Sequence, residues 1–425
     1  MHWNEKVWKN SMREFSRFVA PVVADLGRSE RRVAATRYLQ GLLMPGARKS
    51  IGPMAERLEV DSQSLQQFMT DSPWDAGEVW RKIRREVVPH MEPVEAWVVD
   101  ETGWLKQGDQ SVGVAHQYCG AVGKQANCQV SVELVVTDGE IAAPIGGRLY
   151  LPESWTEDRE RCAKAAVPET VSFKTKLELA LDLIDEAIAD AVMRGPVLGD
   201  SAYGDAGPFR RALRNRELEY FLQVDAGQLR GWATRVKTER KRTRWRVQAG
   251  QPAATCLRAL ANTIVPRQWK RARWKAADGT DRETRLAWQT IYLASDFDET
   301  TGEWPLCWMA VDWPEGKDHP YHIYVAVLHR QPTVARCLKL SRGRWPIEQY
   351  FQRSKDELGF DHFEGRSWLG FHHHLVLTAV AYLFILASYL RNKKNFWCYV
   401  GTSAPIDPAV AGEADRVLPL LPREI

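Results

Sequence analysis

The chain has 425 residues, of which 44% are hydrophobic and 26% charged, and its formal net charge is only +4. This composition is typical of a globular protein with a sizeable core, and the length predicts two or three domains. The seven cysteines form no CxxC or CxxH pair, which argues against a structural zinc site. No apolar signal-like segment stands at the start, so we expect a reducing, cytoplasmic location.

Residues 1–90 show helical periodicity and almost no strand signal, which predicts an α-helical N-terminal domain. Two short helices are expected at 50–58 and 62–68, on either side of a tight turn. In a helix-turn-helix, the second of these would offer its polar side chains to DNA bases or phosphates. Those side chains are Ser62, Gln63, Gln66 and Gln67. A plain helical hairpin in a bundle is the alternative.

From about residue 93 the pattern changes to strands. An apolar run at 96–99 ends in Asp100, and a second at 196–199 ends in Asp200. Further strands are expected at 112–118, 129–136, 145–151 and 220–224, and a helix at 173–193. A meander of strands, a helix and a strand ending in an acid is the order expected of a ribonuclease-H-like α/β sheet.

The segment from Arg230 to Arg285 carries a large positive charge. It contains sixteen Lys and Arg residues against four Asp and Glu residues, a net charge of +12, so the rest of the chain is net acidic. Four tryptophans are interleaved with these cations. Clustered cations neutralise DNA phosphates and aromatic rings can stack on bases, so the segment is a candidate DNA-binding surface, with Arg240, Lys241, Arg242 and Arg244 as its densest cluster. A solvated sheet face whose tryptophans belong to the core is the alternative.

Strands continue at 286–293, 305–313 and 322–328, so a β-rich insertion separates Asp200 from the next candidate acid. That acid is Glu348, in a helix that also carries Arg344 and Lys355. At about 100° per residue, the three side chains share one helix face, with two cations beside the carboxylate. After this helix, the apolar run 375–390 is shorter than the roughly 20 residues that span a membrane, and we expect a buried core helix and no membrane partner.

Asp100, Asp200 and Glu348 together suggest a metal site. Carboxylates at strand ends, completed by one from a helix, can hold two divalent ions about 3.5–4 Å apart. Such a pair of ions is used to cleave and join phosphodiesters.

At these residues the chain resembles the DDE transposases of bacterial insertion sequences with a Tyr-x2-Arg-x3-Glu-x6-Lys signature. Arg344, Glu348 and Lys355 match that spacing, and Ser341 stands at the tyrosine position. The resemblance, over residues of about 90 to 390, implies a ribonuclease-H-like core with Asp100, Asp200 and Glu348 as catalytic metal ligands. It also implies two Mg²⁺ ions, for which Mn²⁺ substitutes, and Arg344 and Lys355 on DNA phosphates.

The implied partners are double-stranded DNA, as transposon ends and target, and a second copy of the chain in a synaptic complex. The location would be the bacterial cytoplasm, at the nucleoid when DNA is bound. The expected units are a helical domain at 1–90, the core at 91–225 and 336–400, a basic β-rich insertion domain at 226–335, and an irregular tail at 401–425. The alternatives are a ribonuclease-H-fold nuclease without strand transfer and a catalytically inactive, transposase-derived DNA-binding regulator.

Overall fold

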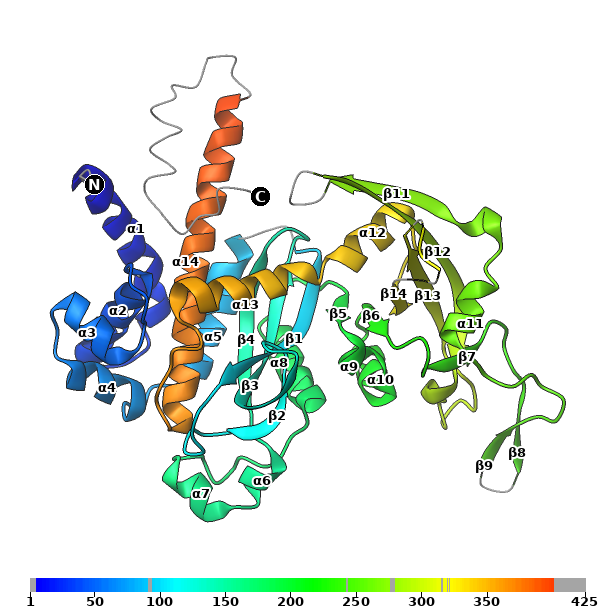
Figure 1. Ribbon diagram of the computed structural model, residues 1–425, viewed down its shortest axis with the longest axis horizontal. Helices are drawn as coiled ribbons and strands as arrows, with labels where there is room; N and C mark the ends of the chain where they lie inside the picture. Colours follow the sequence, from blue (N-terminus) through cyan, green and yellow to red (C-terminus); the bar gives the residue numbers. More distant parts are fainter. Residues whose placement is uncertain are drawn as a thin grey trace.

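The computed structural model describes residues 5–90, 94–241, 244–275, 280–314, 316–318, 320 and 322–400. Its first part is a set of helices, as the sequence predicts (Figure 1). Their bounds are α1 Glu5–Val23, α2 Ser29–Leu43, α3 Ile51–Leu58, α4 Ser62–Thr70, α5 Ala76–Lys82, η1 Ile83–Val87 and η2 Val88–His90. The hairpin of α3 and α4 is the predicted pair of short helices. It turns at Glu59, which ends α3 in the left-handed conformation, and Asp61 then caps α4 by accepting a 2.8 Å hydrogen bond from Ser64 N.

The middle of the molecule is built on six strands. They are β1 Ala96–Leu105, β2 Ala115–Cys119, β3 Lys124–Thr137, β4 Ala142–Tyr150, β5 Val197–Gly199 and β6 Tyr220–Val224. β3 is antiparallel to β1, and its other edge pairs with β2 at one end and β4 at the other. β5 is parallel to both β1 and β6, which gives the order β4-β3-β1-β5-β6. The predicted mixed α/β architecture is therefore confirmed.

Helices cover both faces of these strands. They are α6 Glu153–Thr156, α7 Arg159–Lys164, α8 Lys176–Ala189, α9 Ser201–Gly204, α10 Gly207–Asn215, α12 Val334–Arg342, α13 Trp345–Leu358 and α14 Trp368–Val400. A Cβ on Gly146 would meet Leu183 of α8, whereas one on the next residue, Gly147, would meet Leu375 of α14. Because consecutive strand residues face opposite sides, α8 and α14 cover opposite faces, and α13 lies beside α14.

The strands between β6 and α12 extend the same sheet. They are β7 Arg230–Trp232, β8 Thr238–Lys241, β9 Arg244–Val247, β10 Thr255–Cys256, β11 Lys270–Lys275, β12 Asp281–Leu293, β13 Leu306–Trp313 and β14 His322–Val327, with α11 Leu257–Asn262, η3 Pro266–Gln268 and η4 Ala294–Asp296. β14 pairs with β6, and the sheet continues through β13 and β12 to β7 and β10. β8 and β9 form a separate hairpin at the far end of this insertion (Figure 1).

One strand prediction was wrong in a way that concerns the site. The sequence suggested that the first apolar run ends at Asp100, but β1 continues for five more residues to Leu105. The extension is stabilised by β3, which pairs with β1 as far as Leu105. Asp100 therefore lies within a strand, while Asp200 does follow the end of β5. The domain boundaries stay predictions, and the tail 401–425 lies outside the described residues.

Helix α14 joins the N-terminal helices to the core. Within the described chain, one helix, Trp368–Arg391, is long and apolar enough to cross a membrane, and 78% of its most apolar stretch is buried in the protein. Its His374 bonds Tyr38 of α2 at 2.7 Å and the Phe360 carbonyl at 3.0 Å. His373 lies 2.9 Å from the Met69 carbonyl. The helix is thus the predicted buried core helix, and these two histidines are packed between elements.

Candidate active site

Asp100 lies where the neighbouring strand β5 has already ended. β1 pairs with β5 only at Trp97 and Val98, while its pairing with β3 continues beyond Asp100. The side chain is 11% exposed, and its Oδ1 accepts a 2.8 Å hydrogen bond from Glu101 N. Crevices at the carboxyl ends of parallel strands are the usual ligand sites of α/β sheets. Asp100 is therefore placed for contact with a ligand.

Asp200 is held at the same edge of the sheet by the short helix α9. Its side chain caps that helix, accepting a 2.9 Å hydrogen bond from Ala202 N. α9 packs very closely on β6, since a Cβ on Gly204 would lie 1.8 Å from the Gln223 carbonyl oxygen. Gly204 is thus required for this close approach. Because β1 and β5 are parallel neighbours, the packing brings Asp200 near Asp100.

Helix α13 brings the third acid and both signature cations to β1. Arg344, at its N-terminus, bonds Asp100 Oδ2 at 2.7 Å through Nη1 and Glu348 Oε1 at 2.5 Å through Nη2. Eleven residues after Arg344, Lys355 Nζ donates a 2.9 Å hydrogen bond to the Gly103 carbonyl of β1. The expected shared helix face is therefore the one that meets β1. Ser341 at the signature tyrosine position bonds only the Leu338 carbonyl through its hydroxyl, at 3.0 Å.

The charges of these groups act on one another. Burial, together with the negative charges of Asp200 and Glu348, raises the pKa of Asp100 to about 7, while the positive charge of Arg344 opposes the shift. Burial also lowers the pKa of Lys355. Acids from β1, the end of β5 and α13 thus lie within electrostatic reach of each other around one guanidinium.

The three carboxylates offer the oxygen donors that Mg²⁺ and Mn²⁺ prefer. Among the residues that the structure describes, however, no group of three acidic, histidine or cysteine side chains is arranged to hold one metal ion. Arg344 instead bonds both Asp100 and Glu348. The donor types therefore fit a divalent metal, whereas the spacing of these side chains in this structure does not.

Glu133 is a fourth acid on this face that the sequence analysis missed. It lies directly opposite Asp100 in the β1–β3 register and is fully buried. Its carboxylate accepts hydrogen bonds from Tyr350 of α13 at 2.9 Å and from Ser131 at 3.0 Å. The signal was present in the sequence: Gln129, Ser131 and Glu133 alternate with apolar residues, which marks one polar face of β3.

A comparison with known protein families identifies the family of this chain. Residues 21–283 match the model of a family described as DDE superfamily endonuclease, more than half of the chain. The chain belongs to the DDE superfamily of endonucleases. This confirms the family resemblance, and a ribonuclease-H-like core is what the DDE family implies for the strands β1 to β6. Asp100 and Asp200 lie within the matched residues, and Glu348 lies beyond them.

A curated relative carries a more specific name. The chain is 30% identical over 200 residues to a protein of Microchaete diplosiphon named "Probable transposase for insertion sequence element IS701". The matched region is 46% of this chain and 49% of the relative, so the chain spans about half the length of that relative.

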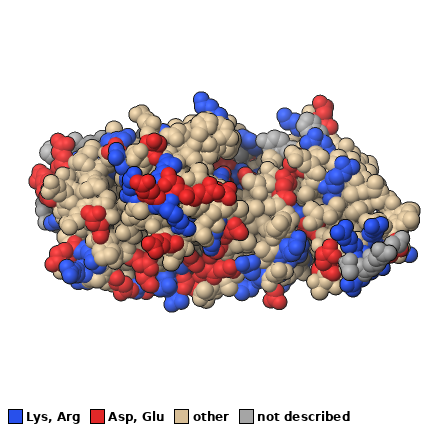
Figure 2. Space-filling model, turned by 90° about the horizontal axis from the view of Figure 1, so that it is seen from below, with Lys and Arg blue, Asp and Glu red and all other residues tan. Residues whose placement is uncertain are grey.

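The DDE endonuclease carries its basic segment on the insertion. On the face shown in Figure 2, acidic side chains are concentrated over the middle of the molecule, and clusters of Lys and Arg lie toward the insertion on the right. Arg240 and Arg244 are exposed on the β8–β9 hairpin. The backbone of Lys241 forms the last residue of β8, and Arg242 lies outside the described residues.

Of the four tryptophans of the segment, Trp232 is buried, and the other three are half-buried against neighbouring side chains. The ring centroids of Trp232 and Trp304 are 4.8 Å apart, and those of Trp269 and Trp313 are 5.4 Å apart. Trp245 packs on Phe297, and Arg342 lies 4.4 Å from the centre of the Trp274 ring. Trp232 therefore has the core role that was the alternative for the tryptophans, whereas the other three rings remain partly exposed.

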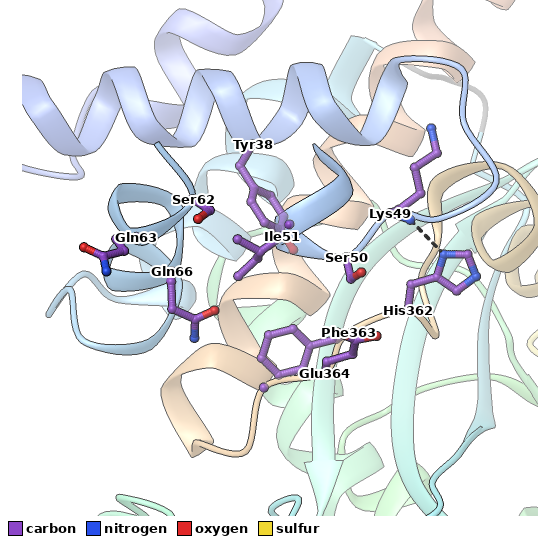
Figure 3. A pocket seen from close by; sticks show the side chains of 12 residues that line it. Tyr38, Lys49, Ser50, Ile51, Ser62, Gln63, Gln66, His362, Phe363 and Glu364 are labelled. Atoms are coloured by element: carbon purple, nitrogen blue, oxygen red, sulfur yellow. Dashed lines mark hydrogen bonds between the residues drawn. The ribbon is translucent and has the colours of Figure 1, made fainter. Parts of the chain in front are cut away.

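The polar side chains of α4 are exposed as predicted. Ser62, Gln63 and Gln66 line a pocket of about 340 Å³ together with Tyr38 of α2 and the loop after α13 (Figure 3). At one end of the pocket, Lys49 N donates a 3.1 Å hydrogen bond to His362 of that loop (Figure 3). The segment that leads into the helical hairpin is therefore joined to the loop that follows α13.

Proposed function

We propose that this DDE endonuclease is a transposase that cleaves DNA at transposon ends and joins those ends to target DNA. The proposal is carried by the convergence of Asp100, Asp200 and Glu348 on one edge of the sheet, with Arg344 and Lys355 beside them. The name of the IS701 relative supports the same reaction.

In this proposal the three acids are the catalytic residues. They would hold a divalent metal, which the family generally uses, as two Mg²⁺ or Mn²⁺ ions that supply Lewis acidity at the scissile phosphate. Lys355, fixed to β1 through the Gly103 carbonyl, keeps its remaining N–H donors for a phosphate oxygen. Arg344 has a planar guanidinium suited to a bidentate phosphate contact.

The DNA would extend from this site over helix α4 and over the insertion. The polar face of α4 would read bases or phosphates, and the exposed cations of the insertion, Arg240 and Arg244 among them, would neutralise the backbone. We propose that Lys241 and Arg242 contact the DNA backbone as well. We further propose a homodimer in the synaptic complex and a cytoplasmic location in bacteria.

The first prediction is that Asp100→Ala, Asp200→Ala and Glu348→Ala each abolish strand cleavage while DNA binding persists. Loss of one ligand disables a site whose residues act as a unit. Cleavage would be measured on labelled DNA carrying the element's ends, with binding followed by fluorescence anisotropy. Asp356→Ala serves as the control, because Asp356 is an exposed acid on the same helix and should retain cleavage.

The same assay separates the alternatives. Full cleavage by any of the three acid variants would refute the site. Cleavage without joining to a target would indicate a nuclease, and binding by the wild type without metal-dependent nicking would indicate a regulator.

A further inference from the structure

Arg344 lies where a cation is needed between two proposed catalytic acids. Its two terminal nitrogens each bond a different carboxylate, Asp100 at 2.7 Å and Glu348 at 2.5 Å. We propose that Arg344 is a displaceable counter-ion: its guanidinium neutralises these acids in the metal-free protein, and divalent metal expels it so that it can bind a DNA phosphate. This inference rests on the proposed function, because it assumes that the acids bind metal.

The need for a counter-ion follows from the burial of Asp100. A buried carboxylate is costly unless it is paired, and here Asp200 and Glu348 add further negative charge close by. The Arg344 side chain is 29% exposed, against 11% for that of Asp100. Arg344 supplies the positive charge that the metal would otherwise provide.

A simple helix-surface ion pair does not account for this geometry. Arg344 and Glu348 are four residues apart on α13, where such pairs are common and weak. The bond to Asp100, however, joins α13 to a strand 244 residues earlier in the chain. With Arg344 bonded to both acids, the described residues include no three-donor cluster for a metal. The guanidinium and the metal therefore compete for the same carboxylate oxygens.

This competition couples two binding events. Metal must break both ion pairs to bind, so the wild-type affinity for metal is weakened by Arg344. Once released, Arg344 is free to contact a phosphate, so metal and DNA should each strengthen the binding of the other. Arg344 is then a positioning residue that moves between the acids and the DNA.

The test is Mn²⁺ binding by the full-length protein without DNA, with free Mn²⁺ counted by electron paramagnetic resonance. Arg344→Gln should tighten Mn²⁺ binding by about tenfold or more, since no partly buried ion pair has to be broken. Arg353→Gln is the matched control, because Arg353 lies on the same helix but its charge acts on Tyr382 of α14. It should change the affinity by less than about twofold, as expected for a charge outside the site.

Arg344→Lys distinguishes displacement of the guanidinium by the metal from simple repulsion between the charge at position 344 and the metal ion. Lysine keeps the charge but cannot bond both acids through a planar fork, so its Mn²⁺ affinity should lie between those of the wild type and Arg344→Gln. An affinity equal to that of the wild type would overturn the proposal. Equal effects of Arg344→Gln and Arg353→Gln would overturn it as well.

A second measurement does not depend on the folding of any Arg344 variant. In wild-type protein labelled with ¹⁵N-arginine, the Arg344 Nε–Hε resonance should shift when diamagnetic Mg²⁺ saturates the site. An unmoved resonance at saturation would overturn the proposal. If Mn²⁺ binding is saturable and lost in Asp100→Ala, but Arg344 has no effect, only this inference fails. If the wild type binds no Mn²⁺ that depends on Asp100, the proposed metal site fails with it.

Discussion

Glu133 shows how one buried residue can join helix α13 to the strand pair β1–β3. It lies on β3 opposite Asp100, and its carboxylate accepts a hydrogen bond from the Tyr350 hydroxyl of α13. Burial raises the pKa of Glu133 to about 7, although the hydrogen bonds from Tyr350 and Ser131 and the charge of Lys355 act in the opposite direction. The folded protein therefore keeps a proton on Glu133 at pH values where the unfolded chain has lost it.

This retained proton predicts a pH-dependent stability. Because the folded pKa lies above the ordinary value of 4.5, the contribution of Glu133 is largest at low pH and is lost as pH rises from about 4.5 to about 7. Relative to Glu133→Gln, the wild-type free energy of unfolding should fall over this range by about 3 kcal/mol. Urea unfolding between pH 4.5 and 8 would measure it.

The comparison has an internal control. Glu160→Gln changes an acid that is 84% exposed, so its stability curve should run parallel to that of the wild type. Parallel curves for the wild type and Glu133→Gln would show that Glu133 is not protonated in the folded protein.

At the scale of elements, a buried ion cluster connects the core to the insertion. Asp296 of η4 is bonded by Arg210 Nε at 3.1 Å and by Arg214 Nη1 at 2.9 Å, both from α10. Arg210 is fully buried and also bonds the Gly204 carbonyl at the end of α9, the helix that Asp200 caps. The cluster therefore links the position of Asp200, one of the proposed catalytic acids, to the insertion.

We expect Asp296→Ala to destabilise the protein by about 3–5 kcal/mol, because it leaves the Arg210 charge buried without its carboxylate. Thermal unfolding followed by circular dichroism would measure the loss. Asp185→Ala is the matched control, since Asp185 pairs at 2.6 Å with Arg216 just after α10 but is 51% exposed. That change should cost less than about 1 kcal/mol. Similar losses for both variants would show that the buried cluster has no special role.

At the scale of the molecule, the separation of charge predicts how DNA is bound. Arg244 and Arg246 are exposed on β9 and alternate with Trp245, which packs on Phe297. They therefore occupy the hairpin face turned away from that packing contact. Arg244→Glu with Arg246→Glu should weaken DNA binding and flatten its dependence on salt by about two units of slope, one for each lost phosphate contact.

The charge-matched control is Arg159→Glu with Lys164→Glu, two exposed cations on α7 of the core. This double variant should keep the wild-type slope of log affinity against log salt concentration in a fluorescence anisotropy titration. An unchanged slope in the Arg244 and Arg246 variant would mean that these cations face solvent in the complex.

The proposed synaptic dimer makes a further prediction for mixed proteins. Glu348→Ala protein, with DNA binding intact, should inhibit wild-type protein when the two are mixed in equal amounts. Mixed complexes would carry one working site, so paired-end products should fall well below the half expected from dilution. A two-end cleavage assay measures this, and a yield of half would rule out paired action.

The sequence by itself predicted the N-terminal helices, the main strands of the core and the three candidate acids. Apolar runs identified the strands around Asp100 and Asp200, and helical spacing placed Arg344, Glu348 and Lys355 on one face, because both patterns depend only on near neighbours in the chain. The length of β1 could not be predicted in this way, since it depends on the pairing with β3.

Only the tertiary structure decided which partners these residues meet. The Arg344–Asp100 pair joins positions 244 residues apart, and the Tyr350–Glu133 bond joins positions 217 apart. The tertiary structure also places β14 beside β6, so that the insertion extends the core sheet. Such contacts arise from the packing of α13 and the strand order. No local periodicity encodes that packing, so the guanidinium between two acids was visible only in three dimensions, whereas the polar alternation in β3 marks Glu133 in the sequence as well.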